Sequence, residues 1–446
     1  MSVGLAFSGG GISAAIGAAC AWNAIVDIYH SIGSTNSLNL TISTVSGGSI
    51  GYGLWANANN KIHFPTYRRN ITLEELLEQH IPESSTVKPS FYDYMNDLEQ
   101  ANKKWCDSEK DGKISVGEFA NKIRRLPFAK LFSRHGKRSN GRRQSHWWTS
   151  FIERIFDIVC VDSILSGEIP WISSFAFLDE TSLSKTNPDQ GTLMPSSSKP
   201  FHHVFVDMLS GSSYIAPLKH HPRQSTSVTE ALSYTSAFWA APLVTAHTIP
   251  YNLFSNLLLR ANSSTSYLVE PTISNKVILD GGVIDTTGLV GLLQQQTEHI
   301  IAFYNNNAQI SKIRSPIAYL FGVDATTDSM NSLLGPSLSQ VFPSELYPNV
   351  IANLTNPKVG MAHLRGINVL PNQMGVEPYV IKNLVIFSNG KNDNFILEER
   401  IMSELSPSWP DRYLFSPPQL DANALCMFND WKVRSHREDL DPILGL

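Results

Sequence analysis

Apolar runs and glycine-rich turns alternate over the first part of the chain. Residues 3–8 are apolar almost throughout and predict a short buried strand, and apolar side chains then recur at helical spacing from 12 to 29. Residues 38–45 predict a second strand, and a sharp turn at 46–48 leads into a helix through Trp55. Two successive strand–turn–helix units predict a parallel sheet with helices packed on it.

The rest of the pattern divides the chain into a core, an insertion and an extension. Further apolar runs predict strands at 171–178, 203–208, 276–279, 299–304, 316–323 and 383–388. Residues 61–165 are more charged and aromatic and predict a mostly helical insertion, whereas 181–199 are polar and predict a surface loop. We therefore expect a core formed by 1–60 and 166–330, with 331–446 as its C-terminal extension.

Composition narrows the class of protein. The 446 residues are 42% hydrophobic and 17% charged, which excludes a disordered chain. With 35 Lys and Arg against 39 Asp and Glu, the net charge is −4, so we expect no nucleic-acid partner. No apolar stretch reaches the roughly 18 residues of a membrane span, and the N-terminus lacks the basic start of a signal peptide. These features predict a cytoplasmic protein.

Four cysteines are scattered along the chain, at positions 20, 106, 160 and 426. Their spacing forms neither a disulfide framework nor a Cys-x-x-Cys metal pair. We expect them to be free, buried thiols.

A serine stands between a predicted strand and a predicted helix. Ser46 is followed by Gly47 and Gly48, and a tight turn here would push the serine hydroxyl out at the end of the strand. The following helix would offer its positive N-terminal end to developing negative charge. The elbow pattern Gly-x-Ser-x-Gly has Gly where this chain has Thr44, so an ordinary glycine-rich turn is the competing interpretation.

Three successive glycines follow the first predicted strand. The segment 8–11 (SGGG) opens the next helix, so backbone N–H groups can approach a ligand with no side chains in the way. Such a loop can bind a phosphate or stabilise a tetrahedral oxyanion. The dinucleotide pattern Gly-x-Gly-x-x-Gly fits poorly, and no Gly-Lys-Ser/Thr follows, which excludes a P-loop.

An aspartate ends another predicted strand. Asp280 follows 276–279 directly and precedes Gly281 and Gly282, which predicts a carboxylate at the edge of the sheet where α/β active sites form. A carboxylate held against a serine hydroxyl can accept its proton without a histidine. Asp285 is the competing acid, and a turn-forming Asp-Gly pair is the competing interpretation.

Together the three motifs resemble the patatin and cytosolic phospholipase A2 superfamily of lipid acyl hydrolases. The matching segments are 8–14 (SGGGISA), 45–49 (VSGGS) and 280–282 (DGG), and 227–238 resembles the helix that the family carries upstream of its aspartate. The resemblance implies a three-layer α/β/α core. It also implies a lipid substrate whose carboxylic ester is cleaved through an acyl-enzyme, as in a phospholipase A2 or lysophospholipase.

The same resemblance implies roles for the site residues. Ser46 would attack the ester carbonyl and Asp280 would accept its proton. Backbone amides would hold the oxyanion, and the expected donors are Gly9, Gly10, Gly11 and Gly47. The family usually has an Arg that helps to hold the headgroup phosphate where this chain has Ser13, which weakens the expected preference for phospholipids more than it weakens hydrolysis.

Residues 107–118 match the calcium loop of an EF-hand. The expected ligands are Asp107, Glu109, Asp111, Lys113 through its backbone carbonyl, Ser115 and Glu118. Glycine stands at the sharp turn of the loop, and apolar residues at helical spacing flank it on both sides. This pattern predicts an inserted EF-hand that binds Ca²⁺ in a regulatory or structural role. A metal-free helical hairpin is the competing interpretation.

A basic stretch follows the calcium loop. Nine basic residues and no acid stand between 122 and 143, and two tryptophans come shortly afterwards. Basic side chains attract anionic headgroups, and tryptophans settle at the bilayer interface. The pattern predicts transient, peripheral membrane contact through Arg138, Arg142, Arg143, Trp147 and Trp148. A solvated linker is the competing interpretation.

Two other functions stay open on the sequence. A Ser-His-Asp esterase would use His363, which follows Ser46 and Asp280 in the chain order of α/β-hydrolases. A catalytically inactive, calcium-binding membrane adaptor would keep the scaffold without its chemistry.

Overall fold

The computed structural model describes part of the chain. The described residues are 2–31, 39–57, 171–178, 186–187, 192–193, 202–207, 212–215, 228–237, 277–283, 285–305, 316–323, 340–355, 360–372, 375–388, 429–430 and 432–445. The expected calcium loop, 107–118, lies outside these ranges, as do the expected membrane contacts between 138 and 148. Both therefore stay predictions.

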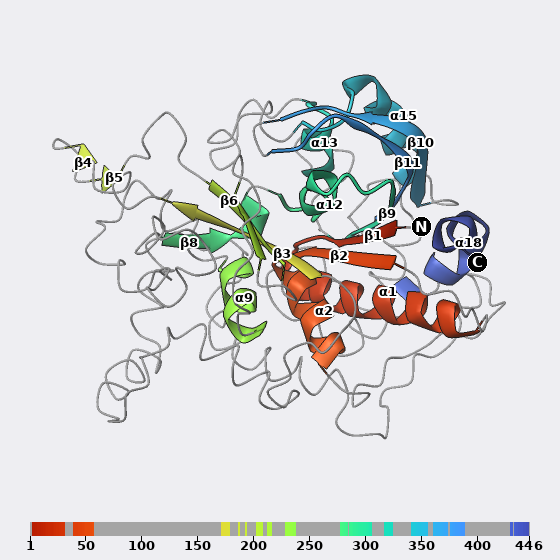
Figure 1. Ribbon diagram of the computed structural model, residues 1–446, viewed down its shortest axis with the longest axis horizontal. Helices are drawn as coiled ribbons and strands as arrows, with labels where there is room; N and C mark the ends of the chain where they lie inside the picture. The colour runs from red at the N-terminus through yellow and green to blue at the C-terminus, as the bar shows by residue number, and fades with distance from the viewer. Residues whose placement is uncertain are drawn as a thin grey trace, which may run out of the picture.

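A nine-stranded sheet forms the centre of the fold (Figure 1). Its order is β10-β11-β9-β1-β2-β3-β6-β7, and β8 pairs with β3 off this path. The bounds are β1 (Ser2–Phe7), β2 (Asn39–Val45), β3 (Trp171–Leu178), β6 (His202–Asp207), β7 (Ser212–Ile215), β8 (Val277–Asp280), β9 (His299–Tyr304), β10 (Met361–Val369) and β11 (Tyr379–Ser388). The neighbours from β11 to β3 pair in parallel, whereas β6, β7, β8 and β10 pair antiparallel. The expected α/β fold is confirmed, and its sheet is mixed.

Helices cover the sheet on both sides (Figure 1). Helices α1 (Gly11–Ser31), α2 (Gly47–Asn57) and α9 (Val228–Thr235) lie on one side, and α12 (Val290–Gln294) lies on the other. The alternation of side chains along β1 explains the division, because Phe7 stacks with Tyr52 of α2 while Gly4 leaves room for Leu292 of α12. The result is the three-layer arrangement.

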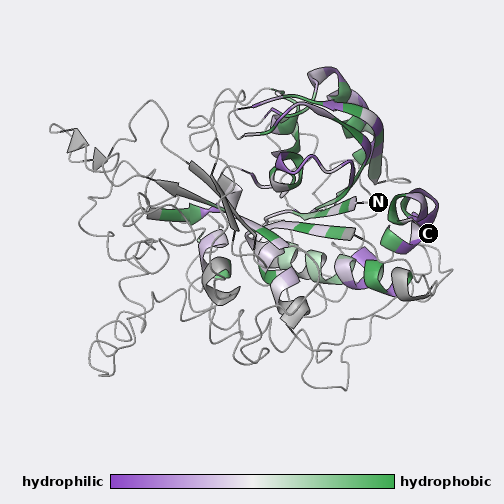
Figure 2. Cartoon of the chain, viewed as in Figure 1, coloured by the Kyte–Doolittle hydropathy of each residue, from purple (hydrophilic) through white to green (hydrophobic). Residues whose placement is uncertain are grey.

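The middle strands carry the hydrophobic core. All six residues of β9 are buried, as are all residues of β1 after the first. Figure 2 shows hydrophobic residues along these strands and at several points along α1. Parallel strands with helices on both faces need such unbroken apolar runs, which is why 3–8 and 299–304 were recognisable in the sequence.

Two expectations about the core are wrong. The apolar run 316–323 forms helix α13 (Pro316–Leu320) and a turn, not a strand. A short buried helix and a buried strand have the same apolar pattern, and Pro316 favours the first helical position. Cys20 is disulfide-bonded, so it is not the free thiol that we expected. The other three cysteines lie outside the described residues.

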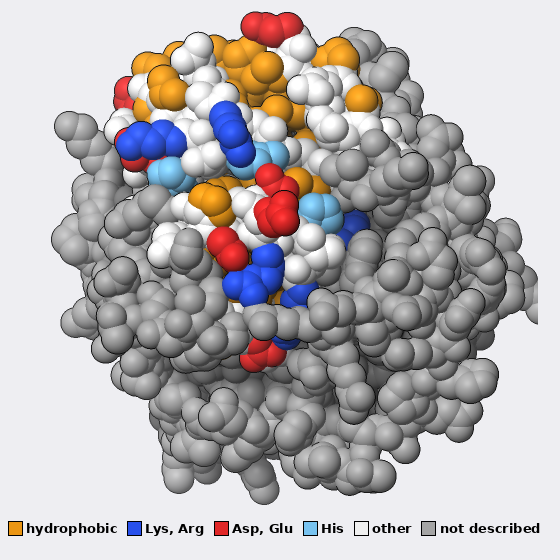
Figure 3. All heavy atoms as spheres, turned by 90° about the vertical axis from the view of Figure 1, so that its right-hand side faces the viewer, with side chains coloured by type: hydrophobic (Ala, Val, Ile, Leu, Met, Phe, Trp, Pro, Cys, Tyr) orange, Lys and Arg blue, Asp and Glu red, His pale blue; other side chains and the backbone are white. Residues whose placement is uncertain are grey.

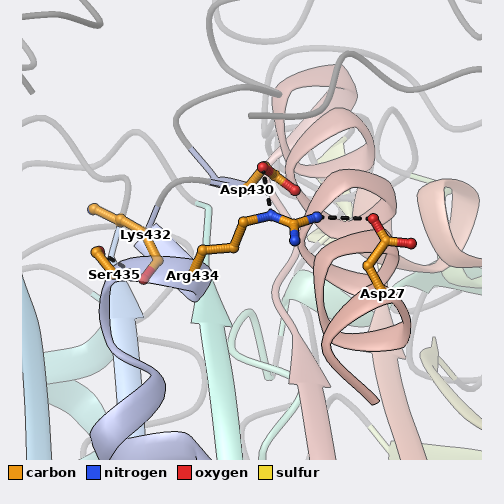
Figure 4. A network of polar contacts seen from close by, with 5 residues as sticks. All are labelled: Asp27, Asp430, Lys432, Arg434 and Ser435. Atoms are coloured by element: carbon orange, nitrogen blue, oxygen red, sulfur yellow. Dashed lines mark hydrogen bonds and ion pairs between the residues drawn. The ribbon is translucent and has the colours of Figure 1, made fainter. Parts of the chain in front are cut away.

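The C-terminal segment is tied to the start of the chain by ion pairs. The Arg434 guanidinium contacts Asp27 of α1 at 2.8 Å and Asp430 at 2.9 Å (Figure 4). Lys432 donates a hydrogen bond to the carbonyl oxygen of Ser388, at the end of β11. These contacts place helix α18 (Arg437–Leu444) against the same body as the N-terminal strand. Figure 3 views this end of the molecule, where basic, acidic and histidine side chains mix on the described surface.

Candidate active site

Ser46 occupies a strained turn between β2 and α2. Its φ is +50°, one of two positive values among the described residues that are not glycine. For a residue other than glycine, this left-handed conformation costs about 1–2 kcal/mol, so the surrounding structure must hold Ser46 in it. Val45 ends β2 and Gly47 begins α2, which is the strand–turn–helix context that the sequence predicted.

Two glycines make the turn possible because backbone atoms approach it closely. A Cβ on Gly47 would lie 1.9 Å from the carbonyl oxygen of Gly11, and a Cβ on Gly48 would lie 2.6 Å from that of Phe7. A Cβ on Gly9 would lie 3.3 Å from Cβ of Ser46. The glycine loop after β1 therefore lies directly against the serine turn, as the two motifs required.

Asp280 meets Ser46 because two strands approach each other end to end. Val45 of β2 pairs with Ser174 of β3 in parallel, and Asp280 of β8 pairs with the next residue, Phe175, antiparallel. Because β6 occupies the other edge of β3, β2 and β8 share one edge and point their C-terminal ends at each other. The hydroxyl of Ser46 donates a hydrogen bond to Oδ2 of Asp280 at 2.6 Å.

The Asp280 carboxyl is buried and oriented. Its Oδ1 accepts a hydrogen bond from the Gly282 amide at 2.7 Å, which leaves Oδ2 for Ser46. Asp280 is 5% exposed and Ser46 is 8% exposed. Burial raises the pKa of Asp280 to about 7, although the hydrogen bonds from Ser46 and Gly282 act in the opposite direction. A carboxyl with a pKa near neutrality suits general base work at physiological pH.

Asp285, the competing acid, has a structural role instead. Its Oδ1 accepts hydrogen bonds from the amide and hydroxyl of Thr287 and from the Gly288 amide, and its Oδ2 accepts one from the Val290 amide. These bonds fix the turn that leads into α12. Burial raises the pKa of Asp285 and the four hydrogen bonds oppose that rise.

The Gly9 amide of the glycine loop, one of the four expected oxyanion donors, already has a hydrogen-bond partner. The Gly9 amide donates to the carbonyl oxygen of Thr286 at 2.8 Å, so it is engaged and is not an oxyanion donor. Gly10 and Gly11 have φ values of 141° and 68° and open α1, while Gly47 opens α2. Amides in the first turn of a helix have no intrahelical acceptor. Gly10, Gly11 and Gly47 therefore remain as candidate donors.

Thr44, the departure from the elbow pattern, lies in a layer of buried hydroxyls. Its Oγ1 accepts a hydrogen bond from Nε1 of Trp171 at 2.8 Å and lies 2.7 Å from Oγ of Ser49. Oγ of Ser49 in turn lies 3.1 Å from Oγ of Ser173 and 3.3 Å from Oγ1 of Thr235. The threonine is thus accommodated by polar partners beneath the turn and does not disturb it.

His363 lies too far away to complete a triad. It stands on β10, four strands from β2 in the sheet order, which corresponds to about 19 Å at the usual strand spacing. Its ring nitrogens contact Asp439 of α18 and Asn383 of β11, each at 3.1 Å. A Ser-His-Asp triad formed by His363 with Ser46 is therefore excluded.

Thr235 is a residue of the site that sequence reasoning missed. The segment 227–238 was matched as a helix, and it contains α9, but nothing in the pattern marked its last residue. The hydroxyl oxygen of Thr235 accepts a hydrogen bond from the Ser46 amide at 2.9 Å. A threonine at the end of a buried helix is a common packing residue, so only the tertiary contact reveals it.

The part of the chain that the structure describes contains no cluster of three His, Cys, Asp or Glu that could hold a metal ion. Within the same ranges, no helix is both long and apolar enough to cross a bilayer.

The structure thus defines an α/β fold with a buried Ser–Asp pair where β2 and β8 meet. No protein-family model and no curated protein match the chain. Five chains among the solved structures match. One of them, human GIVD cytosolic phospholipase A2, has a TM-score of 0.44 and 9% sequence identity. That match covers 100% of this chain and 60% of the other, so the chain spans about three fifths of the length of its structural neighbour.

Proposed function

We propose that the chain is a carboxylic-ester hydrolase that uses Ser46 and Asp280 as a catalytic dyad, and that its substrates are lipids. The observation that carries the reaction is the 2.6 Å hydrogen bond from Ser46, a serine whose backbone has a strained, positive φ, to a buried carboxylate. The lipid substrate rests on the resemblance of the three motifs to lipid acyl hydrolases. Phospholipase A2 or lysophospholipase activity is the form that this resemblance favours.

The acylation step would begin with proton transfer within the dyad. Oδ2 of Asp280 accepts the hydroxyl proton of Ser46 as Oγ attacks the carbonyl carbon of the ester. The amides of Gly10, Gly11 and Gly47 stabilise the oxyanion that forms. When the intermediate collapses, the alkoxide leaving group takes the proton from Asp280, and the acyl group stays on Ser46.

The deacylation step would use the same groups with water in place of the serine hydroxyl. Asp280 accepts a proton from the water molecule as the water oxygen attacks the acyl carbonyl carbon. Collapse of the second intermediate releases the fatty acid and returns the proton to Oγ of Ser46. His363 takes no part, in agreement with its distant position in the sheet.

The calcium and membrane features complete the proposal as predictions. We propose that the loop 107–118 binds Ca²⁺ in a regulatory or structural role, and that the basic and aromatic residues from 138 to 148 bring the enzyme to a lipid surface. Neither is needed for the chemistry of the dyad. If the chain binds calcium and membranes but hydrolyses no ester, it is the catalytically inactive adaptor that the sequence left open.

Covalent labelling tests the proposal most directly. A fluorophosphonate probe should label the wild-type chain on Ser46, and Ser46→Ala should abolish both labelling and hydrolysis of a panel of lipid esters. Ser435→Ala, which removes an exposed serine far along the chain, is the matched control and should behave as wild type. A folded wild-type chain that neither labels nor hydrolyses any ester, with or without Ca²⁺, would favour the adaptor.

A further inference from the structure

The hydroxyl of Thr235 connects three segments at the base of the serine turn. Thr235 is fully buried at the end of α9. Its Oγ1 accepts the Ser46 N–H at 2.9 Å and donates to the carbonyl oxygen of Ser174 on β3 at 2.6 Å. Ser174 is the residue that pairs with Val45, immediately before the nucleophile, so one hydroxyl bridges the turn to the strand that aligns it.

The directions of these hydrogen bonds follow from the number of protons. Thr235 has one hydroxyl proton, and the carbonyl of Ser174 can only accept, so that proton goes to Ser174. The lone pairs of Oγ1 are then directed to donors, and the Ser46 amide is one of them. The arrangement allows no alternative in which Thr235 donates to the turn. The hydrogen bonds to Ser46 and Ser174 therefore each have one fixed direction, whereas either oxygen could be the donor in the 3.3 Å contact between Thr235 and Ser49.

We propose that Thr235 is a positioning residue for the nucleophile. This inference rests on the proposed function. The φ of +50° at Ser46 is unfavourable, and a buried amide without an acceptor would add a further cost. By accepting that amide, Thr235 holds the turn in the conformation that directs Oγ of Ser46 at Oδ2 of Asp280.

The same contact limits the oxyanion site. Because its N–H is bonded to Thr235, Ser46 does not contribute its own amide to the oxyanion. The Gly9 amide is engaged by Thr286. The oxyanion site is thus confined to the amides at the starts of α1 and α2, and Thr235 affects it only through the position of the turn.

Three substitutions at one position separate positioning from packing. Thr235→Val keeps the shape but lacks the hydroxyl, Thr235→Ala removes the bulk as well, and Thr235→Ser keeps the hydroxyl. We expect kcat to fall about 100-fold in the first two, with KM unchanged, because a misplaced nucleophile affects the reaction and not the binding of the ester. Thr235→Ser should restore kcat to within a few fold of wild type.

The readout is the rate per folded site. Rates of hydrolysis and of fluorophosphonate labelling are divided by the fraction of folded protein, measured by thermal unfolding. The midpoint of the pH profile should move to higher pH in Thr235→Val, because a misplaced Ser46 hydroxyl no longer lowers the pKa of Asp280 through its hydrogen bond. Ser236→Ala, which removes the adjacent buried hydroxyl that donates to the Leu232 carbonyl, is the matched control and should keep wild-type kcat.

The outcomes distinguish this inference from the proposed function. If Thr235→Val or Thr235→Ala reacts at the wild-type rate per folded site, or if Thr235→Ser loses as much as Thr235→Val, the positioning role is wrong although the dyad stands. If Thr235→Val does not fold, the comparison of Thr235→Ala with Thr235→Ser decides. A wild-type chain that does not react at all would overturn the dyad and the positioning role together.

Discussion

Replacing Asp280 by Asn should stabilise the fold while it abolishes catalysis. The Asn side chain has nearly the same shape, so its oxygen can accept the Gly282 amide and its NH₂ group can donate to Oγ of Ser46. What the substitution removes is a charge that burial makes unfavourable. A group kept for catalysis at a cost in stability is expected of an active site, and a structural carboxylate would give the opposite result.

The size of the effect follows from the pKa of Asp280. Burial raises it from 3.8 to about 7, so between these values the folded state binds a proton that the unfolded state has lost. The stability of the wild type therefore falls as pH rises through this range and stays low above it. Three pKa units correspond to about 4 kcal/mol, which is the upper limit of the gain that Asp280→Asn should show at pH 9. Near pH 3 the side chain at position 280 is neutral in the wild type and in Asp280→Asn, whether folded or unfolded. The gain in stability from the substitution should therefore vanish.

Chemical denaturation at a series of pH values measures this difference, and ester hydrolysis on the same samples measures activity. In the wild type, kcat/KM should rise with pH to a plateau with a midpoint near 7, because the dyad needs the ionised carboxylate. Asp280→Asn should show no hydrolysis at any pH. A stability difference between the two proteins that does not change with pH would refute the reasoning, since it would mean that Asp280 is not desolvated in the folded state.

Four further predictions follow from other parts of the chain. Asp285→Asn should deprive the Val290 amide of its carboxylate acceptor, and the resulting loss of stability, measured by denaturation, should shrink as pH rises, because burial raises the pKa of Asp285 and disfavours the charge that the substitution removes. Gly51→Ala should cost several kcal/mol, since its Cβ would lie 2.0 Å from the carbonyl oxygen of Ala15, whereas Gly366→Ala, at φ 63° with open space around it, should cost only about 1–2 kcal/mol. Alkylation without reduction, read by mass spectrometry, should leave Cys20 unmodified, and alkylation after reduction should modify it. Calorimetry should detect Ca²⁺ binding to the loop 107–118 at millimolar concentration or below, and the EF-hand prediction fails if it does not.

Local sequence patterns were sufficient to predict the middle of the sheet and the turns that carry Ser46 and Asp280. Strands with helices on both faces are apolar throughout, and glycines are required where two backbones approach. Ser46 and Asp280 were therefore recognisable as candidates from their own neighbours in the sequence. The close contact between Gly11 and Gly47 is likewise the physical reason for two glycine motifs that the sequence shows separately.

Features that depend on pairing across the fold were not predictable. Strand β10 is an edge strand whose apolar alternation is interrupted by the positive φ of Gly366, so its pattern was missed. The sequence does not distinguish the Gly9 amide from the amides of Gly10 and Gly11. Only the position of Thr286 in the fold shows that the Gly9 amide is hydrogen-bonded. The hydroxyl of Thr235 has its partners at distances of 61 and 189 residues along the chain, which no local pattern records.

The end-to-end approach of β2 and β8 also explains how Ser46 and Asp280 meet directly, with no imidazole between them. A triad places an imidazole between serine and carboxylate, so the two backbones can stay apart. A direct hydrogen bond of 2.6 Å needs the backbones themselves to converge. They do so on β3, where adjacent residues, Ser174 and Phe175, pair with Val45 and Asp280. At Gly281 the convergence leaves no space for a side chain, because a Cβ there would lie 2.2 Å from the Ser174 carbonyl oxygen. The glycine after the aspartate is therefore a requirement of the dyad geometry, as is the glycine after the serine.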